Sequence, residues 1–135
     1  MVRYMPLFFN YYYLATMYVL MISFRTALSV QRKNILDLLS GSIGPTLSNR
    51  GCIHCCISLD YDDKAVVNYC ERWDSLESFT HHIQSLDFWN IFLAIDMCDQ
   101  EPSVYCDEVI NTGGLEMLKQ LRTSKKTACI GAGPG

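Results

Sequence analysis

From Tyr4 to Phe24 the chain carries no charged residue, and Arg3 and Arg25 bracket this uncharged run. A stretch of this length could cross a bilayer as a helix. Its residues, however, are aromatic and β-branched rather than leucine-rich, and a proline and an asparagine interrupt it. This composition favours a strand in the second half of the run over a membrane segment.

The second half of the uncharged run alternates in the way a strand with one buried face does. One face of an extended chain would carry Tyr18, Leu20, Ile22 and Phe24, and the other face ends in polar residues. We therefore expect a first strand over residues 16–26, with residues 1–14 as an N-terminal extension to which we assign no role. The alternative reading of the same residues is a membrane anchor over residues 4–24. A true start at Met17 would also account for the extension.

The length, charge and cysteine content of the chain limit how many domains it can form and which partners it can have. With 135 residues it can close one hydrophobic core, so we expect one domain and one site. Its net charge of −3 includes no cluster of basic residues, and nucleic acid is therefore not an expected partner. Seven cysteines are an odd number, and their spacing matches no small disulfide framework. We expect reduced thiols in a cytoplasmic protein.

Three of these cysteines stand beside His54 and invite comparison with a zinc site. Cysteine and histidine are the ligands that zinc prefers, and Cys52, Cys55 and Cys56 flank this histidine. On an extended strand, alternate residues share one face at intervals of about 7 Å and do not converge on one ion. A second half of such a site is also missing. We therefore expect small core residues here and no metal.

The remainder of the chain alternates between helical and extended patterns. Helical spacing of Ile35, Leu36, Leu38, Leu39, Ile43 and Leu47 predicts a helix that Ser29 caps, with a bend or break near Gly44. Two strands over residues 52–59 and 65–73 follow, joined by an aspartate-rich turn into a hairpin.

The second half of the chain starts with another helix. Asp74 or Ser75 caps it, and Glu77 completes a capping box with Asp74. Its inward positions are Leu76, Phe79, Ile83 and Leu86, and a second helical run over residues 88–97, capped by Asp87, turns Phe88, Ile91, Phe92 and Ile95 inward. A strand over residues 103–110, a short helix over 115–122 and a mobile C-terminal tail over 123–135 complete the prediction.

The order strand, helix, strand, strand, helix, strand predicts an α+β protein with the ferredoxin-like split βαββαβ fold. Its domain would span residues 15–122. Two helices would cover one face of a four-stranded antiparallel sheet, and the other face would be bare. Because a soluble monomer seldom exposes so large an apolar face, we expect a homodimer formed through the sheet face.

Five residues carry a resemblance to a known family. Gly51 and Cys52 open the second strand, Glu71 and Trp73 end the third, and His82 follows on the next helix. This pattern resembles the antibiotic biosynthesis monooxygenase (ABM) family, which is quinol monooxygenase-like and part of the dimeric α/β-barrel superfamily. The resemblance covers residues 16–122. Many members have a second histidine, whose place Asp87 takes here, ahead of Phe88.

The resemblance implies a cofactor-independent monooxygenase that oxidises a quinol or another small phenolic substrate with molecular oxygen. It implies an apolar pocket between the helices and the sheet. His82 would be the catalytic base, since a histidine ring can take up and release a proton near neutral pH. Trp73 would stack on the substrate ring, Phe88 would close the apolar wall, and Tyr69 and Glu71 would supply a hydrogen bond or orient the histidine.

Other readings of the same residues remain open. Trp73 at the end of a strand can be a core packing residue, Glu71 an edge charge, and His82 a structural or solvated neighbour of His81. At the level of function, the alternative is a non-catalytic protein of the same fold that binds a small aromatic or haem-like ligand. A third reading is a membrane-tethered form of the enzyme.

Overall fold

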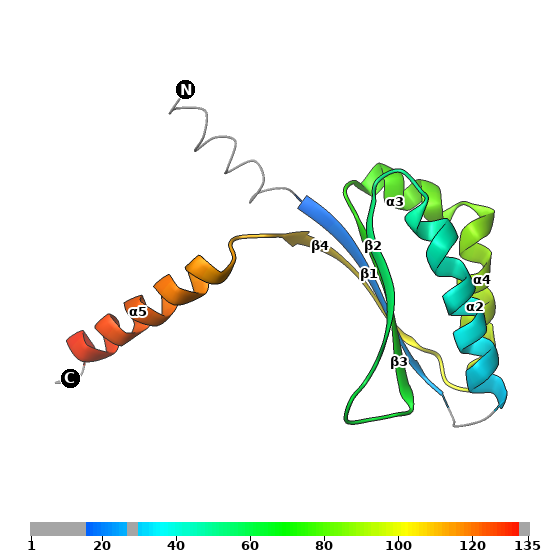
Figure 1. Cartoon of the computed structure of the whole chain (residues 1–135), viewed down its shortest axis with the longest axis horizontal. Helices are drawn as coiled ribbons and strands as arrows, with labels where there is room; N and C mark the ends of the chain where they lie inside the picture. Colours follow the sequence, from blue (N-terminus) through cyan, green and yellow to red (C-terminus); the bar gives the residue numbers. More distant parts are fainter. Residues whose placement is uncertain (1–15, 27–29, 133–135) are drawn as a thin grey trace. The chain divides into compact units, whose positions relative to one another are not determined.

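The computed structural model describes residues 16–26 and 30–132 and contains the predicted order of elements (Figure 1). The elements are β1 (Thr16–Arg25), α2 (Val30–Leu47), β2 (Cys52–Leu59), β3 (Val66–Trp73), α3 (Leu76–Ile83), the 3-10 turn η1 (Leu86–Phe88), α4 (Trp89–Asp96), β4 (Ser103–Ile110) and α5 (Leu115–Ala132). The predicted strands all form, and their ends lie within one residue of the predicted ends.

The four strands form one sheet in the order β2-β3-β1-β4. Strand β3 is antiparallel to both of its neighbours, and its last residue, Trp73, lies opposite Tyr18 of β1 and Cys52 of β2. The first and last strands are adjacent, and the two middle strands form a hairpin, which is the split arrangement of the ferredoxin-like fold. The predicted fold class is therefore confirmed.

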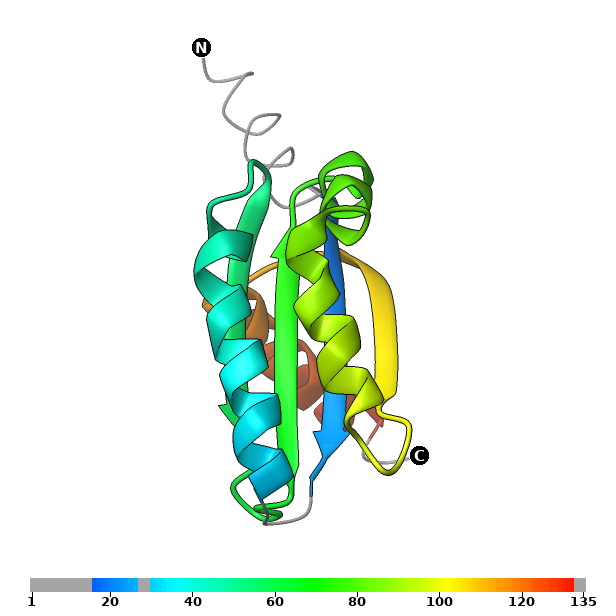
Figure 2. The same cartoon turned by 90° about the vertical axis from the view of Figure 1, so that its right-hand side faces the viewer.

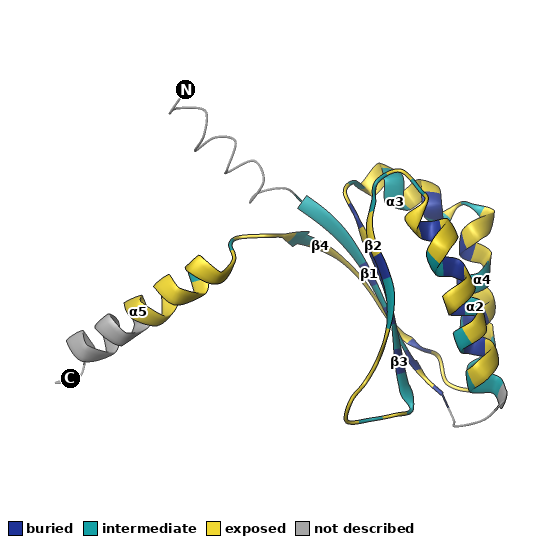
Figure 3. Cartoon of the chain, viewed as in Figure 1, coloured by how far each residue is buried: buried dark blue, intermediate teal, exposed yellow. Residues whose placement is uncertain are grey.

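Helices α2, α3 and α4 lie on one face of this sheet, and α2 and α4 run side by side across it (Figure 2). The alternation of β1 predicted which of its residues face the helices. One apolar core cluster contains Leu20, Ile22 and Phe24 of β1, Val67 and Tyr69 of β3, Cys55 of β2, Ile35 and Leu39 of α2, and Phe88, Ile91 and Ala94. They gather where the helices meet the sheet (Figure 3).

The strand reading of the uncharged run is confirmed from Thr16 onward, because β1 occupies Thr16–Arg25. The first half of the run and the predicted cap Ser29 lie outside the described residues. Within residues 16–26 and 30–132, no helix combines the length and the apolar character that crossing a membrane requires.

Helix α2 continues where a break was predicted. It runs through Gly44 and Pro45 to Leu47. Proline removes one backbone N–H, but the helical pattern resumes after it, since the Ser48 N–H donates to the Gly44 carbonyl at 3.1 Å. The Asn49 side chain donates to the Pro45 carbonyl at 3.0 Å and supports the last turn. The helix therefore does not break at Gly44, and a bend there stays a prediction.

The caps of the later helices agree with the prediction only in part. Ser75 alone caps α3, and its Oγ accepts from the Ser78 N–H at 3.1 Å. The third helical position is then Ser78, so the predicted capping box of Asp74 with Glu77 is one residue out of register. Asp87 lies inside η1, and α4 follows without a side-chain cap.

Three predicted inward positions on these helices are exposed. Leu76 is 55% exposed, Leu86 91% and Phe92 45%. Helix α3 ends at Ile83, and the 3-10 turn that follows has a different rotation per residue, so the helical spacing does not carry through to Leu86. The buried residues of this layer are His82, Phe88, Ile91 and Ala94.

The chain divides into two compact units, one of residues Thr16–Val109 and one that contains α5. In the second unit α5 extends to Ala132, ten residues past the predicted end at Arg122. No proline follows Arg122 before residue 134, and no glycine before Gly131, so nothing in the sequence stops the helix earlier. The predicted division into residues 1–14, 15–122 and 123–135 stays a prediction.

Candidate active site

Strand β3 supplies three of the five predicted site residues from one face. Tyr69, Glu71 and Trp73 alternate along the strand, and all three side chains are fully buried beneath the helices. The period of two predicted that they share a face. A glutamate with no exposed surface requires compensation, because burying an unpaired carboxylate costs several kcal/mol or more.

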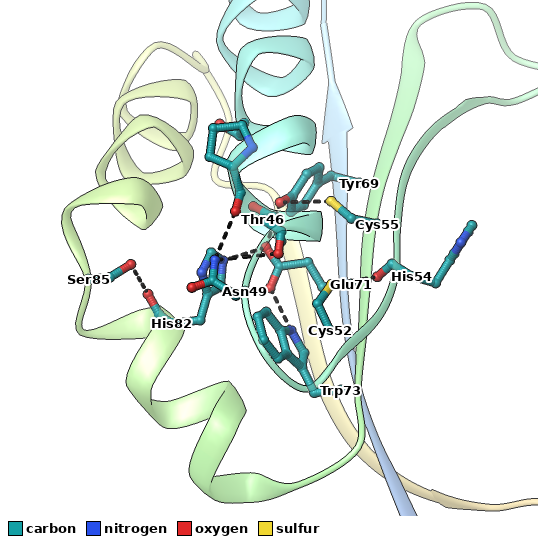
Figure 4. A network of polar contacts seen from close by, with 12 residues as sticks. Thr46, Asn49, Cys52, His54, Cys55, Tyr69, Glu71, Trp73, His82 and Ser85 are labelled. Atoms are coloured by element: carbon teal, nitrogen blue, oxygen red, sulfur yellow. Dashed lines mark hydrogen bonds and ion pairs between the residues drawn. The ribbon is translucent and has the colours of Figure 1, made fainter.

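The Glu71 carboxylate obtains this compensation from three donors (Figure 4). Its Oε1 accepts from Trp73 Nε1 at 3.0 Å. Its Oε2 accepts from the Tyr69 hydroxyl at 2.5 Å and contacts His82 Nε2 at 3.0 Å. Because the three donors come from β3 and from α3, the carboxylate ties the helix to the sheet. Glu71 is therefore not the edge charge that one reading of the sequence allowed.

His82 reaches this carboxylate from the last turn of α3. It is 1% exposed, whereas its neighbour His81 is exposed to solvent. Its ring stacks on Trp73 with centroids 4.8 Å apart and an interplanar angle of 29°. Phe88 meets the same ring edge-on at 5.4 Å. All five predicted site residues are thus brought together in one cluster, which we call the β3 end cluster: Tyr69, Glu71, Trp73, His82 and Phe88.

The contact with Glu71 determines which nitrogen of His82 carries hydrogen. An ionised carboxylate can only accept, so Nε2 must be the donor in this contact. In the neutral ring Nδ1 then carries a lone pair. That atom is buried and has no hydrogen-bond partner among the described residues. With the ring neutral, the site holds a histidine that a carboxylate orients, with one accepting nitrogen left over, which is the arrangement of a general base.

The network extends to β2 through a cysteine that the sequence did not indicate as a site residue. Cys55 Sγ lies 3.4 Å from the Tyr69 hydroxyl and donates to it. Burial raises the pKa of the Cys55 thiol to about 12. Burial, with the nearby Glu71 charge, also raises the pKa of Tyr69. Both groups therefore keep their protons at neutral pH and act as hydrogen-bond donors.

Gly51, which opens β2, is required by the way α3 approaches the sheet. Its φ is +90°, and a Cβ at this position would lie 2.4 Å from Ser78 Oγ and 2.6 Å from Asp74 Oδ1. Its carbonyl accepts from the Asp74 N–H at 2.9 Å. A glycine here lets the start of α3 pack closely against β2, and this packing aims the following turns of α3 at Glu71.

Thr46 is the second residue that sequence reasoning missed. The fully buried stripe of α2 consists of Ile35, Leu39, Ser42 and Thr46, whereas the predicted inward residue Leu47 is 47% exposed. The helical period from Ile35 and Leu39 leads to residues 42 and 46, but a search for apolar residues passes over a serine and a threonine. Thr46 Oγ1 is buried and, like His82 Nδ1, has no hydrogen-bond partner among the described residues.

The side chains around His82 are buried, and the apolar pocket that the resemblance implies at this place stays a prediction. The residues of the β3 end cluster are at most 4% exposed and pack against one another. Trp73 uses one face of its indole ring to stack on His82. A surface groove of about 430 Å³ lies elsewhere, lined by Asn34, Asp37, Leu38, Gly41 and Asn90, and contains no residue of the cluster.

The cysteines beside His54 do not gather around one point. A register shift between Cys52 and His54 interrupts the pairing of β2 with β3, His54 is exposed, and Cys55 is buried on the helix face. In the described part of the chain, no three histidine, cysteine, aspartate or glutamate side chains are grouped as metal ligands.

Comparison with known proteins places this fold in a class. No family model matches the chain, and no curated protein matches it by sequence. Solved structures do match it. A "putative antibiotic biosynthesis monooxygenase" from Deinococcus radiodurans is 15% identical with a TM-score of 0.62, and the match covers 74% of this chain and 97% of that one.

Two further structures agree with this match. A protein with the same description from Chloroflexus aurantiacus is 22% identical, with a TM-score of 0.56 and coverage of 73% of this chain and 96% of that one. A conserved protein from Methanosarcina mazei is 20% identical, with a TM-score of 0.63 and coverage of 73% and 96%. The chain thus has the fold of ABM-like proteins, as the five motif residues predicted.

Proposed function

We propose that this protein is a cofactor-independent monooxygenase that oxidises a quinol or a related small phenol with molecular oxygen. The observation that carries the proposal is the buried Glu71–His82 pair, in which Nε2 faces the carboxylate and Nδ1 is left without a partner. The similarity to ABM-like structures supports the class of reaction, because two of them carry the description "putative antibiotic biosynthesis monooxygenase".

In the proposed reaction His82 Nδ1 accepts the proton of a substrate hydroxyl. The resulting phenolate is a far better electron donor to oxygen than the neutral phenol. For a hydroquinone with a free ring C–H position, the products are a hydroxyquinone and water. One oxygen atom replaces the ring hydrogen as a hydroxyl group, the other leaves as water, and the substrate supplies all four electrons. Glu71 stabilises the imidazolium that forms after proton transfer.

The aromatic residues of the cluster provide the enclosure for this step. Trp73 and Phe88 hold the His82 ring from its face and its edge, which restricts the direction in which Nδ1 points. They also exclude water, so that a charge formed on the substrate interacts strongly with nearby donors.

A non-catalytic role for the same enclosure, as a binding site for a small aromatic or haem-like ligand, is the second candidate. The unpartnered Nδ1 of His82 would hold a hydroxyl group of such a ligand without any turnover.

Oxygen consumption separates these two candidates. Purified protein is mixed with a panel of substituted hydroquinones in an oxygen electrode, with free hydroquinone autoxidation subtracted. We expect uptake above background, and a decrease of about 10²–10⁴-fold in the His82→Ala variant, which is the usual contribution of a general base. His81→Ala is the matched control, because the neighbouring histidine is exposed. Circular dichroism establishes that both variants fold.

The enzyme proposal fails if the wild-type protein consumes no oxygen with any hydroquinone, or if His82→Ala consumes it at the wild-type rate. Binding of the same hydroquinones without oxygen uptake, measured by calorimetry under argon and in air, would support the binding protein instead.

We also propose that two copies of the chain pair through the sheet face that α2, α3 and α4 leave uncovered. The register places on that face Val19, Met21 and Ser23 of β1, Asn68, Cys70 and Arg72 of β3, and His54, Cys56 and Ser58 of β2. This surface mixes apolar with polar side chains, as interfaces between subunits do. Sedimentation velocity tests it, and Met21→Lys, at the centre of the face, should shift the protein from dimer to monomer.

A further inference from the structure

Three hydroxyl groups near the end of α2 differ in how they bond. Ser42 Oγ donates to the Leu38 carbonyl at 2.8 Å, and Ser48 Oγ donates to the Gly44 carbonyl at 2.9 Å. Each thus bonds back to the preceding turn, which is the usual solution for a hydroxyl inside a helix. Thr46, between them, does not: its Oγ1 is buried and unpartnered, and the residue is 1% exposed. Leaving a buried hydroxyl unpaired costs about 1–3 kcal/mol.

The unpartnered hydroxyl lies at the same end of the sheet as His82. The Thr46 carbonyl accepts from the Asn49 N–H at 3.1 Å, and the Asn49 carbonyl accepts from the Cys52 N–H at 3.2 Å. Cys52 lies opposite Trp73 in the sheet, and Trp73 stacks on His82. Figure 4 draws both side chains in this neighbourhood, Thr46 from α2 and His82 from α3. The two unsatisfied buried atoms therefore belong to one region.

These two atoms are complementary in their hydrogen-bonding capacity. In the neutral ring with hydrogen on Nε2, which faces Glu71, His82 Nδ1 can only accept. The hydroxyl of Thr46 can donate as well as accept. One oxygen atom that carries a hydrogen would satisfy both, because it can donate to Nδ1 and accept from Thr46. An apolar ligand would satisfy neither atom, and a carboxylate could not donate to Nδ1.

We propose that Thr46 is the second polar group that holds the reacting hydroxyl of the substrate, an acidic hydroxyl on an aromatic or enolic carbon. When that hydroxyl passes its proton to His82 Nδ1, the oxygen becomes negative, and the hydrogen bond from Thr46 becomes charge-assisted and stronger. Thr46 therefore stabilises the charge that develops during deprotonation, which is the role of an oxyanion-hole donor. This inference rests on the function proposed above, because it assigns the partner of the same base.

The test uses binding of 4-nitrophenol, which is not a quinol and whose absorption near 400 nm reports its ionised form. Wild-type protein, Thr46→Val and Thr46→Ser are titrated with this probe by calorimetry and by absorbance. Valine has nearly the shape of threonine and removes only the hydroxyl, whereas serine keeps it. We expect Thr46→Val to bind the phenolate about 10-fold or more weakly, as the loss of a hydrogen bond to a charged group predicts, and Thr46→Ser to retain binding.

Ser42→Ala is the matched control, since Ser42 is buried on the same stripe of α2 but has its own partner. It should bind 4-nitrophenol like the wild-type protein. Urea unfolding gives a second readout that does not depend on any ligand. Thr46→Val should be at least as stable as the wild type, because it removes an unpaired buried hydroxyl, and Ser42→Ala should be less stable, because it removes a bond that is made.

The outcomes separate this inference from the proposed function. If quinols are oxidised and Thr46→Val changes neither 4-nitrophenol binding nor kcat/KM, the assignment of Thr46 is overturned while the enzyme proposal stands. If no quinol is oxidised but 4-nitrophenol binding depends on the Thr46 hydroxyl, the enzyme proposal fails and the site stands. A wild-type protein that does not bind 4-nitrophenol overturns the assignment of Thr46.

Discussion

The two ends of β3 bury side chains on the same face of the sheet but by different means. At one end Val67 lies opposite Phe24 in an apolar core, where removal of hydrocarbon from water contributes about 25 cal/mol per Å². At the other end Glu71 is just as deeply buried, and three hydrogen bonds are needed to offset its loss of hydration. The first end stabilises the fold by contact alone.

This difference between the two ends of β3 indicates which of them is the candidate functional site. A buried carboxylate with its partners seldom stabilises a protein more than apolar residues of the same volume would. The polar end also leaves Thr46 Oγ1 and His82 Nδ1 unsatisfied, which costs further stability. A region that holds a carboxylate, a histidine and two unpaired polar atoms at the expense of stability is a candidate for function.

The largest expected effect comes from removing the centre of the polar end. Glu71→Ala leaves the donors of Tyr69, Trp73 and His82 buried without their acceptor, and we expect it to lower the free energy of unfolding by about 3–5 kcal/mol. Ile22→Val, in the apolar core beneath the helices, should cost only about 0.5–1.5 kcal/mol. Urea unfolding followed by fluorescence measures both variants. Equal losses would remove the contrast between the two ends.

A smaller effect is expected at the turn that brings α3 to the polar end. Gly51→Ala places a Cβ in a left-handed backbone and against Ser78, so we expect a loss of about 1–3 kcal/mol. Gly41→Ala, in the middle of α2, meets nothing within 4 Å and should raise stability by about 0.5–1 kcal/mol. Thermal unfolding by calorimetry should therefore show shifts of opposite sign. A neutral Gly51→Ala would contradict the close approach of α3.

Alkaline pH should also reduce the stability that the polar end of β3 gives to the fold. Because the pKa of Tyr69 is raised in the folded protein, the unfolded chain loses this proton first, at its ordinary value near 10. The contribution of Tyr69 to the free energy of unfolding is therefore complete below pH 10. It is lost as the pH rises above 10, by about 1.4 kcal/mol per pH unit at most. Unfolding measured from pH 8 to 11 should show a smaller slope for Tyr69→Phe.

Tyr61→Phe, which alters a tyrosine that is 97% exposed, is the control for the alkaline series. It should leave the slope at its wild-type value. Cys55 adds to the same trend, since its raised pKa of about 12 makes the unfolded state ionise first above pH 9. If the free energy of unfolding falls with pH equally steeply in Tyr69→Phe, the polar end does not control the loss of stability at alkaline pH.

Much of the arrangement followed from local patterns in the sequence. Alternation predicted that Leu20, Ile22 and Phe24 share one face, and the same period placed Tyr69, Glu71 and Trp73 on the face beneath the helices. The order of the strands and helices predicted the split ferredoxin-like sheet. These patterns depend only on the geometry of the chain over a few residues, so a single sequence reveals them.

Other features depended on how the layers meet. The sequence did not reveal that Glu71 Oε2 would serve both Tyr69 and His82, that the indole of Trp73 would be stacked on His82, or that Thr46 would be left without a partner. It left the cap of α3 open between Asp74 and Ser75, and it placed the capping box one residue too early. Each of these results turns on distances of about 3–5 Å between side chains from different elements. The packing of helices on the sheet sets such distances, and the spacing of residues along one element cannot supply them.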